Sequence, residues 1–423
     1  MTGFKVHLFS LFAALAAALA SAPASAATRA TPEVRWVSSW ASSQILVDPK
    51  DVLPPQQTKD VTLRQLVRLS IGGSPVRVRL SNAMGTSPLA ISGVSIAHAL
   101  SRNSPRIDPS TIRKVTFAGA EAMVIPPGAE YVSDRIDLRA AALATLAVSM
   151  HLSELPKLQT GHPGSRATSY FVPGDQLATP ELRDAGKIDH WYFLSGIDVE
   201  PERPSAAIAI VGDSITDGHG VISNTDTRWT DTLTARLKTS AATRAISVLN
   251  LGIGSNCLAE ACVGPNAAAR FERDVLARNG VRYLIILEGV NDLGMLTRDA
   301  PVSAEAHRAL VQRMIGALAQ ISAQAQERGI KVIGATILPY GGSGYYHPDA
   351  ANEADRRAIN DWIRTPGSVD AVVDFDALMR DPAQPNRLRK EFDSGDGLHP
   401  SAAGYRFMGE AVPLTLFTIG ARR

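Results

Sequence analysis

The sequence predicts an α/β protein: a three-layer sandwich built around a parallel sheet, preceded by an all-β sandwich. Two observations support this prediction. Between residues 61 and 152, short runs of alternating apolar and polar residues are separated by turn residues, with no helical pattern between them. From residue 208 onwards, continuous apolar runs alternate with segments of helical period. A chain of 423 residues also exceeds one ordinary hydrophobic core, so we expect two domains.

Residues 1–26 are expected to form a secretory signal peptide. Lys5 precedes an apolar stretch over residues 8–22 that is too short to cross a bilayer, and Ala24 and Ala26 form the small-residue pattern of a cleavage site. We expect cleavage after about Ala26 and a secreted or periplasmic protein, with an uncleaved anchor as the alternative. No later apolar run has the length of a membrane span, so stable membrane insertion is not expected.

The composition excludes several classes of partner and cofactor. The 43 Lys and Arg residues nearly balance the 41 Asp and Glu residues, and the basic residues are scattered, so no nucleic-acid partner is expected. No group of His, Asp, Glu or Cys has the spacing of a metal site, so no metal and no other cofactor is expected. Cys257 and Cys262 are the only cysteines. In an oxidising compartment they are able to pair, and two reduced thiols are the alternative.

The β-sandwich domain, which we expect to be jelly-roll-like, is placed at residues 27–200. Between residues 76 and 80, three apolar residues alternate with two arginines, as in a half-buried strand. Gly72 and Gly73 precede this run and predict a hairpin turn. Further strands are expected at residues 89–96, 112–117, 131–138 and 146–152.

The α/β domain is placed at residues 201–423, after a polar stretch with two prolines over residues 196–207. Its apolar runs lack polar alternation, which is typical of parallel strands buried on both faces. These runs lie at residues 208–211, 246–249, 283–287, 332–337 and 369–375. Apolar residues of helical spacing lie between them, which predicts right-handed strand–helix–strand crossovers.

The stretch IAIVGDSITDGHG, residues 208–220, places Ser214 directly after the first of these strands. Active sites in open α/β sheets lie beyond the carboxyl ends of the strands, which is where this serine stands. The stretch lacks the lysine of a phosphate-binding loop and the glycine spacing of an α/β-hydrolase elbow. An ordinary turn with Ser214 as a local cap is the alternative, so the interpretation depends on the rest of the chain.

The stretch DGLHP contains Asp396 and His399, three residues apart. A serine hydroxyl becomes a good nucleophile when a base takes its proton, and that base needs an orienting partner. The spacing lets the Asp396 carboxylate reach the ring of His399. A helix is expected to begin at Pro400, so capping of that helix is the alternative role for Asp396.

Two further blocks follow strands and are therefore expected at the same edge of the sheet. LEGVNDLG contains Asn291 after the strand at residues 283–287, and LNLGIGSN at residues 249–256 is glycine-rich. An amide NH2 from Asn291 and a backbone N–H from residues 252–256 would together hold an oxyanion.

The four blocks GDSITDG, NLGIGSN, GVND and DGLHP resemble, in this order, those of the SGNH (GDSL) hydrolases, the lipase/acylhydrolase family, over residues 208–411. The resemblance implies a flavodoxin-like sheet with a catalytic serine, aspartate and histidine. It makes Ser214 the nucleophile, His399 the general base and then acid, and Asp396 its orienting partner. It also implies oxyanion donors from the Ser214 amide, a glycine amide and the Asn291 side chain.

The second block departs from the family pattern N-x-G-x-x-G-N. The donor glycine, five residues after Asn250, is replaced by Ser255, and Gly254 precedes it. The backbone N–H survives this change provided that Ser255 adopts the backbone conformation of the glycine, so the third donor is either Ser255 or Gly254. A disulfide between Cys257 and Cys262 would stiffen the loop that carries this donor.

The resemblance implies a secreted serine ester hydrolase with an acyl-enzyme intermediate on Ser214. The N-terminal half, with VSSWASSQ and VRLSNAMG, looks like the β-sandwich of a secreted subgroup related to xylan esterases. This likeness favours acetyl or short-chain esters, either small molecules or plant polysaccharide. A lysophospholipase or lipase-type acylhydrolase is the first alternative. A carbohydrate-binding protein whose catalytic half is impaired is the second.

Several aromatic residues and histidines receive no catalytic role. Trp40 and Trp191 are expected to pack in the interior rather than line a sugar platform. His219 and His307 are expected to be exposed to solvent. The loop at residues 338–348 follows the fourth strand and is a candidate lid or wall of an acyl pocket.

Overall fold

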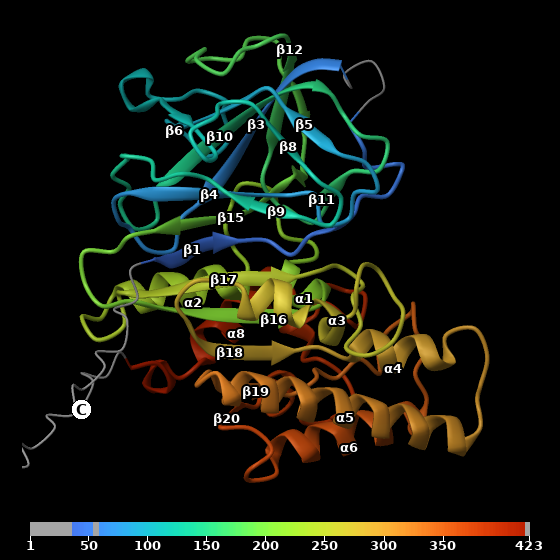
Figure 1. Ribbon diagram of the computed structural model, residues 1–423. Coiled ribbons are helices and arrows are strands. Elements are labelled where there is room, and N and C mark those ends of the chain that lie inside the picture. Colours follow the sequence, from blue (N-terminus) through green and yellow to red (C-terminus); the bar gives the residue numbers. More distant parts are fainter. Residues whose placement is uncertain (1–35, 54–58, 419–423) are drawn as a thin grey trace, which may run out of the picture. The chain divides into compact units, whose positions relative to one another are not determined.

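The chain folds first into antiparallel sheets and then into a parallel sheet with helices (Figure 1). The structure is a computed structural model that describes residues 36–53 and 59–418. Strands up to Val199 pair antiparallel, and a parallel sheet begins at Ala206. This arrangement confirms the predicted fold class. The predicted signal peptide, residues 1–26, lies outside the described residues.

The N-terminal region contains two larger sheets and two small ones, each built from residues distant in sequence. The six-stranded sheet has the order β13-β12-β3-β10-β6-β7, and the four-stranded sheet has the order β1-β15-β4-β9. The strands of these two sheets are β1 (Val37–Ala41), β3 (Lys59–Arg68), β4 (Val76–Ser81), β6 (Gly93–His98), β7 (Arg113–Val115), β9 (Glu130–Val132), β10 (Thr145–Glu154), β12 (Ser169–Pro173), β13 (Gly186–Ile188) and β15 (Leu194–Val199). The small sheets contain β2 (Ile45–Leu46), β11 (Thr160–His162) and β14 (Trp191–Tyr192), and β5 (Leu89–Ile91) with β8 (Met123–Ile125).

The hairpin predicted at Gly72 and Gly73 is wrong. Strand β3 pairs with β10 and β12, whereas β4 pairs with β15 and β9, so the chain crosses from one sheet to the other at this point. A Cβ on Gly72 would lie 2.5 Å from the carbonyl oxygen of Ala140, and one on Gly73 would lie 2.5 Å from that of Glu200. The two glycines are therefore needed because the crossing segment runs close to neighbouring backbone.

All five predicted parallel strands are present in one sheet, ordered β17-β16-β18-β19-β20. They are β16 (Ala206–Gly212), β17 (Ile246–Gly252), β18 (Val281–Leu287), β19 (Lys331–Ala335) and β20 (Ala371–Val373). Numbered within the sheet, this order is 2-1-3-4-5, that of flavodoxin-like folds. The chain leaves β16 towards one edge and later passes to the other side of it, so the point between β16 and β18 is where ligands bind in such sheets.

Helices cover the sheet in two groups. Helix α2 (Trp229–Lys238) packs against α8 (Ala402–Ala411), and α5 (Ala304–Glu327) packs against α6 (Ala350–Arg364). Shorter helices carry the loops at the sheet edge: α1 (Ser214–Asp217), α3 (Ala267–Phe271), α4 (Val290–Thr297) and α7 (Phe375–Met379). None of the helices in the described part of the chain has the length and apolarity needed to cross a membrane.

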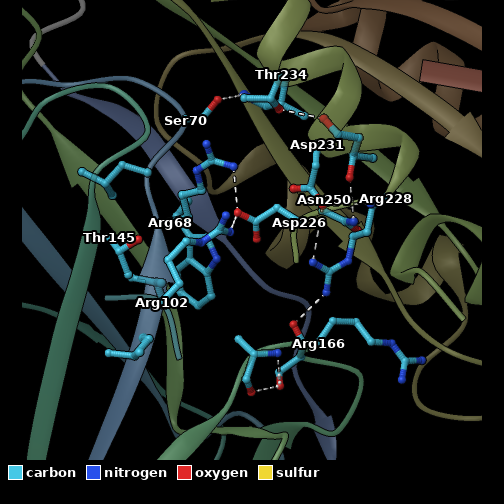
Figure 2. Close-up of a pocket in the computed structure, with 18 of the residues that line it drawn as sticks. Arg68, Ser70, Arg102, Thr145, Arg166, Asp226, Arg228, Asp231, Thr234 and Asn250 are labelled. Carbon is cyan, nitrogen blue, oxygen red and sulfur yellow. Dashed lines mark hydrogen bonds and ion pairs between the residues drawn. The ribbon is translucent and has the colours of Figure 1, made fainter. Parts of the chain in front are cut away.

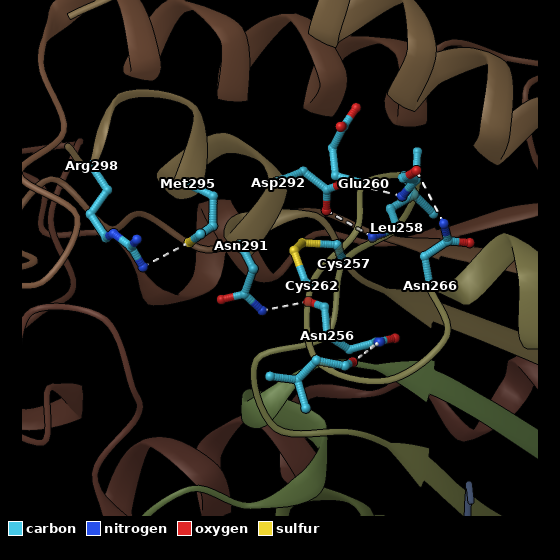
Figure 3. Close-up of a disulfide and its surroundings, with 12 residues drawn as sticks. Asn256, Cys257, Leu258, Glu260, Cys262, Asn266, Asn291, Asp292, Met295 and Arg298 are labelled. Carbon is cyan, nitrogen blue, oxygen red and sulfur yellow. Dashed lines mark hydrogen bonds between the residues drawn. A yellow bond between two sulfur atoms is a disulfide. The ribbon is translucent and has the colours of Figure 1, made fainter. Parts of the chain in front are cut away.

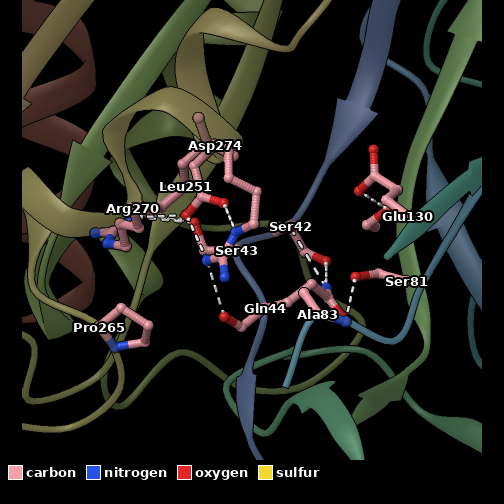
Figure 4. Close-up of polar contacts among 12 residues, drawn as sticks. Ser42, Ser43, Gln44, Ser81, Ala83, Glu130, Leu251, Pro265, Arg270 and Asp274 are labelled. Atoms are coloured by element: carbon pink, nitrogen blue, oxygen red, sulfur yellow. Dashed lines mark hydrogen bonds and ion pairs between the residues drawn. The ribbon is translucent and has the colours of Figure 1, made fainter. Parts of the chain in front are cut away.

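The antiparallel region packs directly on the parallel sheet. Strand β1 lies beside β17, the edge strand, and one apolar cluster of buried side chains extends through both regions. Figure 4 shows the polar contacts at this junction, where Arg270 is fully buried. Its guanidinium donates to the Ser43 hydroxyl at 2.9 Å and pairs with Asp274 at 3.2 Å. The described residues lie in one compact unit, and the boundary at residue 200 stays a prediction.

Candidate active site

The turn that carries Ser214 is built from the end of β16. A Cβ on Gly212 would lie 2.3 Å from the Thr216 hydroxyl and 2.7 Å from the carbonyl oxygen of Leu287, so a larger residue has no room there. Asp213 then caps α1, because its carboxylate accepts a hydrogen bond from the Ile215 N–H at 2.8 Å. Ser214 is the first residue of this helix and stands next to the point where the strand order reverses.

Ser214, His399 and Asp396 lie in one hydrogen-bonded line. The Ser214 Oγ is 2.8 Å from His399 Nε2, and His399 Nδ1 is 2.6 Å from Asp396 Oδ2. The other oxygen of Asp396 accepts the backbone N–H groups of Leu398 and His399. Helix α8 is capped by Ser401 instead, so Asp396 does not have the alternative role of a helix cap.

Asp396 is held in its ionised form. Partial burial alone would raise the pKa of this carboxyl, but the backbone N–H and ring of His399 and the N–H of Leu398 lower it to about 2. A carboxylate that stays ionised at Nδ1 directs the other ring nitrogen, Nε2, towards Ser214 as a proton acceptor.

The Asn291 side chain is oriented from both ends. Its Nδ2 donates to the Asn256 carbonyl at 2.5 Å (Figure 3), and its Oδ1 accepts the Tyr346 hydroxyl at 2.6 Å. Because a phenol donates readily to the amide oxygen, the amide nitrogen is kept on the opposite side. Tyr346, which lies in the loop at residues 338–348, therefore contacts the candidate oxyanion donor Asn291.

Three backbone amides in this area have no acceptor among the described residues: those of Ser214, Gly254 and Ser255. Ser255 has φ +57°, the left-handed conformation in which glycine is favoured. The serine thus adopts the backbone that the family pattern requires of a glycine. The choice between Gly254 and Ser255 as the donor stays a prediction.

A short disulfide loop follows these amides. Cys257 and Cys262 are bonded to each other (Figure 3). Asp292, next to Asn291, accepts the backbone N–H groups of residues 258, 259 and 260 at 2.7–3.1 Å. Burial nevertheless raises the pKa of the Asp292 carboxyl, which these hydrogen bonds only partly offset. The loop and the first turn of α4 are therefore held together by both covalent and hydrogen bonds.

Two further buried carboxyls lie beneath the site, and the sequence interpretation missed them. Burial raises the pKa of Asp213 to about 7, with Asp292 adding to this shift. Burial, together with the charge of Asp213, raises the pKa of Glu288 well above its usual range. Neither carboxyl oxygen of Glu288 has a partner among the described residues. The sequence did contain a signal for Glu288, because this glutamate directly follows the apolar strand at residues 283–287.

His219 is exposed, as the sequence predicts, but it also contacts the catalytic candidates, which the sequence did not indicate. Its ring stacks on that of His399, with centroids 3.9 Å apart and planes at 23°. Its N–H donates to the Ser214 carbonyl at 2.8 Å, and its own carbonyl accepts the Tyr405 hydroxyl. Burial and the neighbouring His399 lower the pKa of the His219 ring, which favours the neutral form.

One group of possible metal ligands occurs among the described residues. His219, Asp396 and His399 each bring a ligand-type atom within 4.8 Å of the others. The two imidazole rings are nearly parallel, so their in-plane lone pairs do not converge on one point. Both ring nitrogens of His399 are also engaged, by Ser214 and Asp396. The donor set as placed fits proton transfer better than metal binding.

The tryptophans discussed above pack in the interior. Trp40 and Trp191 meet edge to face with ring centroids 4.8 Å apart, and each is at most 8 % exposed. His162 stacks on Trp191 and contacts Asp217 at the end of α1 at 3.0 Å. These aromatic rings therefore connect the antiparallel region to the serine helix.

Residues 210–407 match the model of the GDSL-like lipase/acylhydrolase family. A search of curated proteins finds no match. The match contains all four blocks, from the turn of Ser214 to the segment of His399.

Solved structures of several esterases resemble the same half of the chain. An acetyl xylan esterase from Geobacillus stearothermophilus is 20 % identical over 49 % of this chain and 92 % of its own, with a TM-score of 0.36. A GDSL-like lipase from Bacteroides thetaiotaomicron is 19 % identical over 48 % of this chain and 84 % of its own, with a TM-score of 0.36. A further acetyl xylan esterase is 19 % identical over 48 % and 96 %, with a TM-score of 0.37.

Proposed function

We propose that this chain, whose residues 210–407 carry a GDSL-like lipase/acylhydrolase domain, hydrolyses carboxylic esters through an acyl-enzyme on Ser214. The observation that supports this most is the unbroken line of hydrogen bonds from Asp396 through His399 to the Ser214 hydroxyl. The line ends at the sheet position where ligands bind in flavodoxin-like folds.

The geometry supplies each step of the reaction. His399 Nε2 takes the proton of Ser214 Oγ as the oxygen attacks the ester carbonyl, and Asp396 stabilises the imidazolium that forms. The negative oxygen of the tetrahedral intermediate is held by the amides of Ser214 and of Gly254 or Ser255 and by the Asn291 side chain. His399 then protonates the departing alcohol, and the same histidine activates a water that releases the acid.

The acyl group is proposed to be small, acetyl or another short chain. Tyr346 lies against Asn291 and is 3 % exposed, so its ring occupies space beside the proposed oxyanion donors. The ester is proposed to be a small molecule or an acetylated plant polysaccharide, with a lysophospholipid or longer acyl ester as the alternative. Export by the N-terminal signal peptide is part of the same proposal, and N-terminal sequencing of the exported protein should begin after about Ala26.

The nucleophile is tested with 4-nitrophenyl acetate and the variant Ser214→Ala. The rate should fall by at least about 10⁴-fold, because no other group forms the acyl-enzyme. Ser153→Ala is the matched control, since Ser153 is an exposed serine on β10 whose side chain makes no hydrogen bond among the described residues. An equal rate in Ser214→Ala and wild type would overturn the proposal.

Two further measurements separate the alternatives. The wild-type rate should fall as the pH is lowered from neutral to mildly acidic values, because protonated His399 cannot accept the serine proton. A flat rate over this range would exclude His399 as the base. Faster hydrolysis of 4-nitrophenyl palmitate than of the acetate would favour the lipase-type alternative. Glycan binding without any turnover would favour the carbohydrate-binding alternative.

A further inference from the structure

A loop of the antiparallel region, residues 162–168, is fastened to the helix that carries the nucleophile. His162 Nε2 lies 3.0 Å from Asp217 Oδ1, and both side chains are buried. Arg228 joins the same two segments, because its Nε donates to the Asp217 carbonyl and its Nη2 to the Ser165 carbonyl, both at 2.7 Å. The position of this loop relative to α1 is therefore fixed by buried polar contacts.

The same loop is fastened to the segment that follows α1. The Asn224 N–H donates to the Arg166 carbonyl at 2.9 Å, and the Asn224 side chain accepts the Thr168 N–H at 2.9 Å. Arg166 itself has φ +49°, a left-handed conformation that costs a non-glycine residue about 1 kcal/mol. Such strain persists only where the surroundings hold it, and it occurs most often at functional sites.

Among the described residues the Arg166 guanidinium has no partner, unlike its neighbours (Figure 2). Arg68 and Arg102 both pair with Asp226, and Arg228 is bonded as described above. The side chain of Arg166 turns away from the Arg68–Asp226–Arg102 group. No described residue forms a hydrogen bond or an ion pair with its guanidinium, and its Nε is buried without a partner. A half-buried cation without a partner is costly unless it meets an anion.

Arg166 lies on the histidine side of Ser214. Its carbonyl accepts the N–H of Asn224, and the segment between α1 and Asn224 contains His219, whose ring stacks on that of His399. The charge of Arg166 also contributes to the lowered pKa of His219, after burial and the neighbouring His399. In the proposed reaction His399 protonates the departing alcohol, whereas Asn291 and the amide of Gly254 or Ser255 hold the oxygen of the acyl carbonyl. A group recognised by Arg166 therefore belongs to the alcohol part of the ester.

We propose that Arg166 binds a carboxylate or phosphate on the alcohol part of the ester, so that esters of acidic sugars and similar anionic alcohols are the preferred substrates. This inference rests on the proposed function. The planar guanidinium matches a carboxylate or phosphate with two parallel hydrogen bonds, which a lysine cannot do. The antiparallel region would then supply the specificity of a reaction whose chemistry lies in the α/β half.

The test compares three aryl acetates that differ in one group: neutral 4-acetoxybenzamide, 4-acetoxybenzoate and 4-acetoxyphenyl phosphate. Wild type should hydrolyse at least one anionic ester with a higher kcat/KM than the neutral one. In Arg166→Gln the ratio of anionic to neutral kcat/KM should fall at least about tenfold, and Arg166→Lys should restore part of it. The ratio does not depend on how much of the variant is folded. Comparison of kcat/KM for 4-acetoxybenzoate and 4-acetoxyphenyl phosphate identifies which anion Arg166 prefers.

Arg308→Gln is the matched control, because it removes the same charge from an exposed position on α5. It should leave the ratio as in wild type. An equal ratio in wild type and Arg166→Gln, or an equal fall in Arg308→Gln, would overturn the role of Arg166 while leaving ester hydrolysis intact. A wild type that hydrolyses none of the three acetates would instead overturn the proposed function, and the inference with it.

Discussion

The two sides of Ser214 each contain a carboxyl group that accepts several backbone N–H groups, yet the two groups ionise differently. Asp396, on the histidine side, accepts two backbone N–H groups and its pKa falls to about 2. Asp292, on the oxyanion side, accepts three, and its pKa is raised. The number of hydrogen bonds therefore does not decide the ionisation. Burial does, because the Asp396 side chain is 43 % exposed whereas Asp292 is almost fully enclosed.

This difference matches the charges that the proposed reaction creates. An ionised Asp396 stabilises the positive imidazolium of His399. On the opposite side, the raised pKa values of Asp213, Glu288 and Asp292 favour neutral carboxyls near the place where a negative oxygen would form. Fixed negative charge there would oppose the oxyanion, so burial of these carboxyls supports the amide donors.

The largest expected effect comes from the histidine side. Asp396→Asn replaces the ionised partner of His399 with an amide, which no longer favours the tautomer that accepts the serine proton. We expect kcat/KM for 4-nitrophenyl acetate to fall by about 10³–10⁴-fold. Asp393→Asn, in the same turn, is the control and should lose far less, since Asp393 accepts only backbone N–H groups, those of Gly395 and Gly397. Similar losses in both variants would mean that Asp396 acts only through the structure of the turn.

The oxyanion side is tested by Tyr346→Phe. Loss of the hydroxyl removes one of the two hydrogen bonds that orient the Asn291 amide, so kcat should fall about tenfold while KM changes little. In an Asn291→Ala background, Tyr346→Phe should reduce kcat little further, because the group that Tyr346 orients is already absent. Additive losses in the double variant would contradict the positioning role. Tyr345→Phe, at the exposed neighbouring ring, is the control.

The buried carboxyls predict a pH dependence of stability. Asp213 has a pKa near 7 when folded, against 3.8 for its ordinary value, so the folded protein binds more protons than the unfolded chain between these values. The stability that the protonated Asp213 carboxyl contributes is complete below about pH 4 and is lost as the pH rises through about 7. The pKa of Glu288 is also raised in the folded protein, by burial and by the charge of Asp213, so its contribution to stability is lost in the same direction as the pH rises.

Glu288→Gln should therefore reduce the loss of stability between pH 5 and pH 8. We expect a gain of about 1–3 kcal/mol in the free energy of unfolding at pH 8, measured by urea titration, and little gain at pH 5. Glu272→Gln removes an exposed acidic charge and should change neither value. Equal gains at both pH values would show that ionisation of Glu288 is not the cause.

The smallest effect is expected at Ser255. Its left-handed backbone costs about 1 kcal/mol, which Ser255→Gly removes, although glycine adds entropy to the unfolded chain. The variant should thus gain at most about 1 kcal/mol in the free energy of unfolding and keep its esterase activity. Ser255→Ala, which retains the strain, should show no gain. A loss of stability in Ser255→Gly would contradict the strained backbone.

Much of the α/β half was predictable because its signals are local. Each parallel strand is a continuous apolar run, and Ser214, Asn291 and His399 follow the ends of such runs or of their helices. The antiparallel region was harder, because its strands pair with residues far away in sequence. The predicted hairpin at Gly72 was wrong for that reason: the glycines serve a crossing between sheets, not a turn within one.

Two histidines show the same limit. His219 is exposed as expected, but its ring also stacks on that of His399. His307 was also expected to be exposed, but it is buried on α5 and its Nδ1 lies 2.5 Å from Asp355. For His307 a signal existed, since it lies three and seven positions before the buried Leu310 and Met314. For His219 no local pattern points to a ring 180 residues away.

The sequence by itself indicated the five parallel strands, the turn of Ser214 and the Asp396–His399 pair. It also indicated that the segments carrying Ser214 and Asn291 lie at one edge of the sheet. Only the tertiary structure decided which carboxyls are buried, how Asn291 is oriented, and that Arg166 of the antiparallel region lies beside the histidine. The physical reason is the difference in sequence separation between the interacting residues. Turns and amphipathic periods depend on neighbours within a few residues, whereas desolvation and ion pairing depend on whatever the folded chain brings into contact.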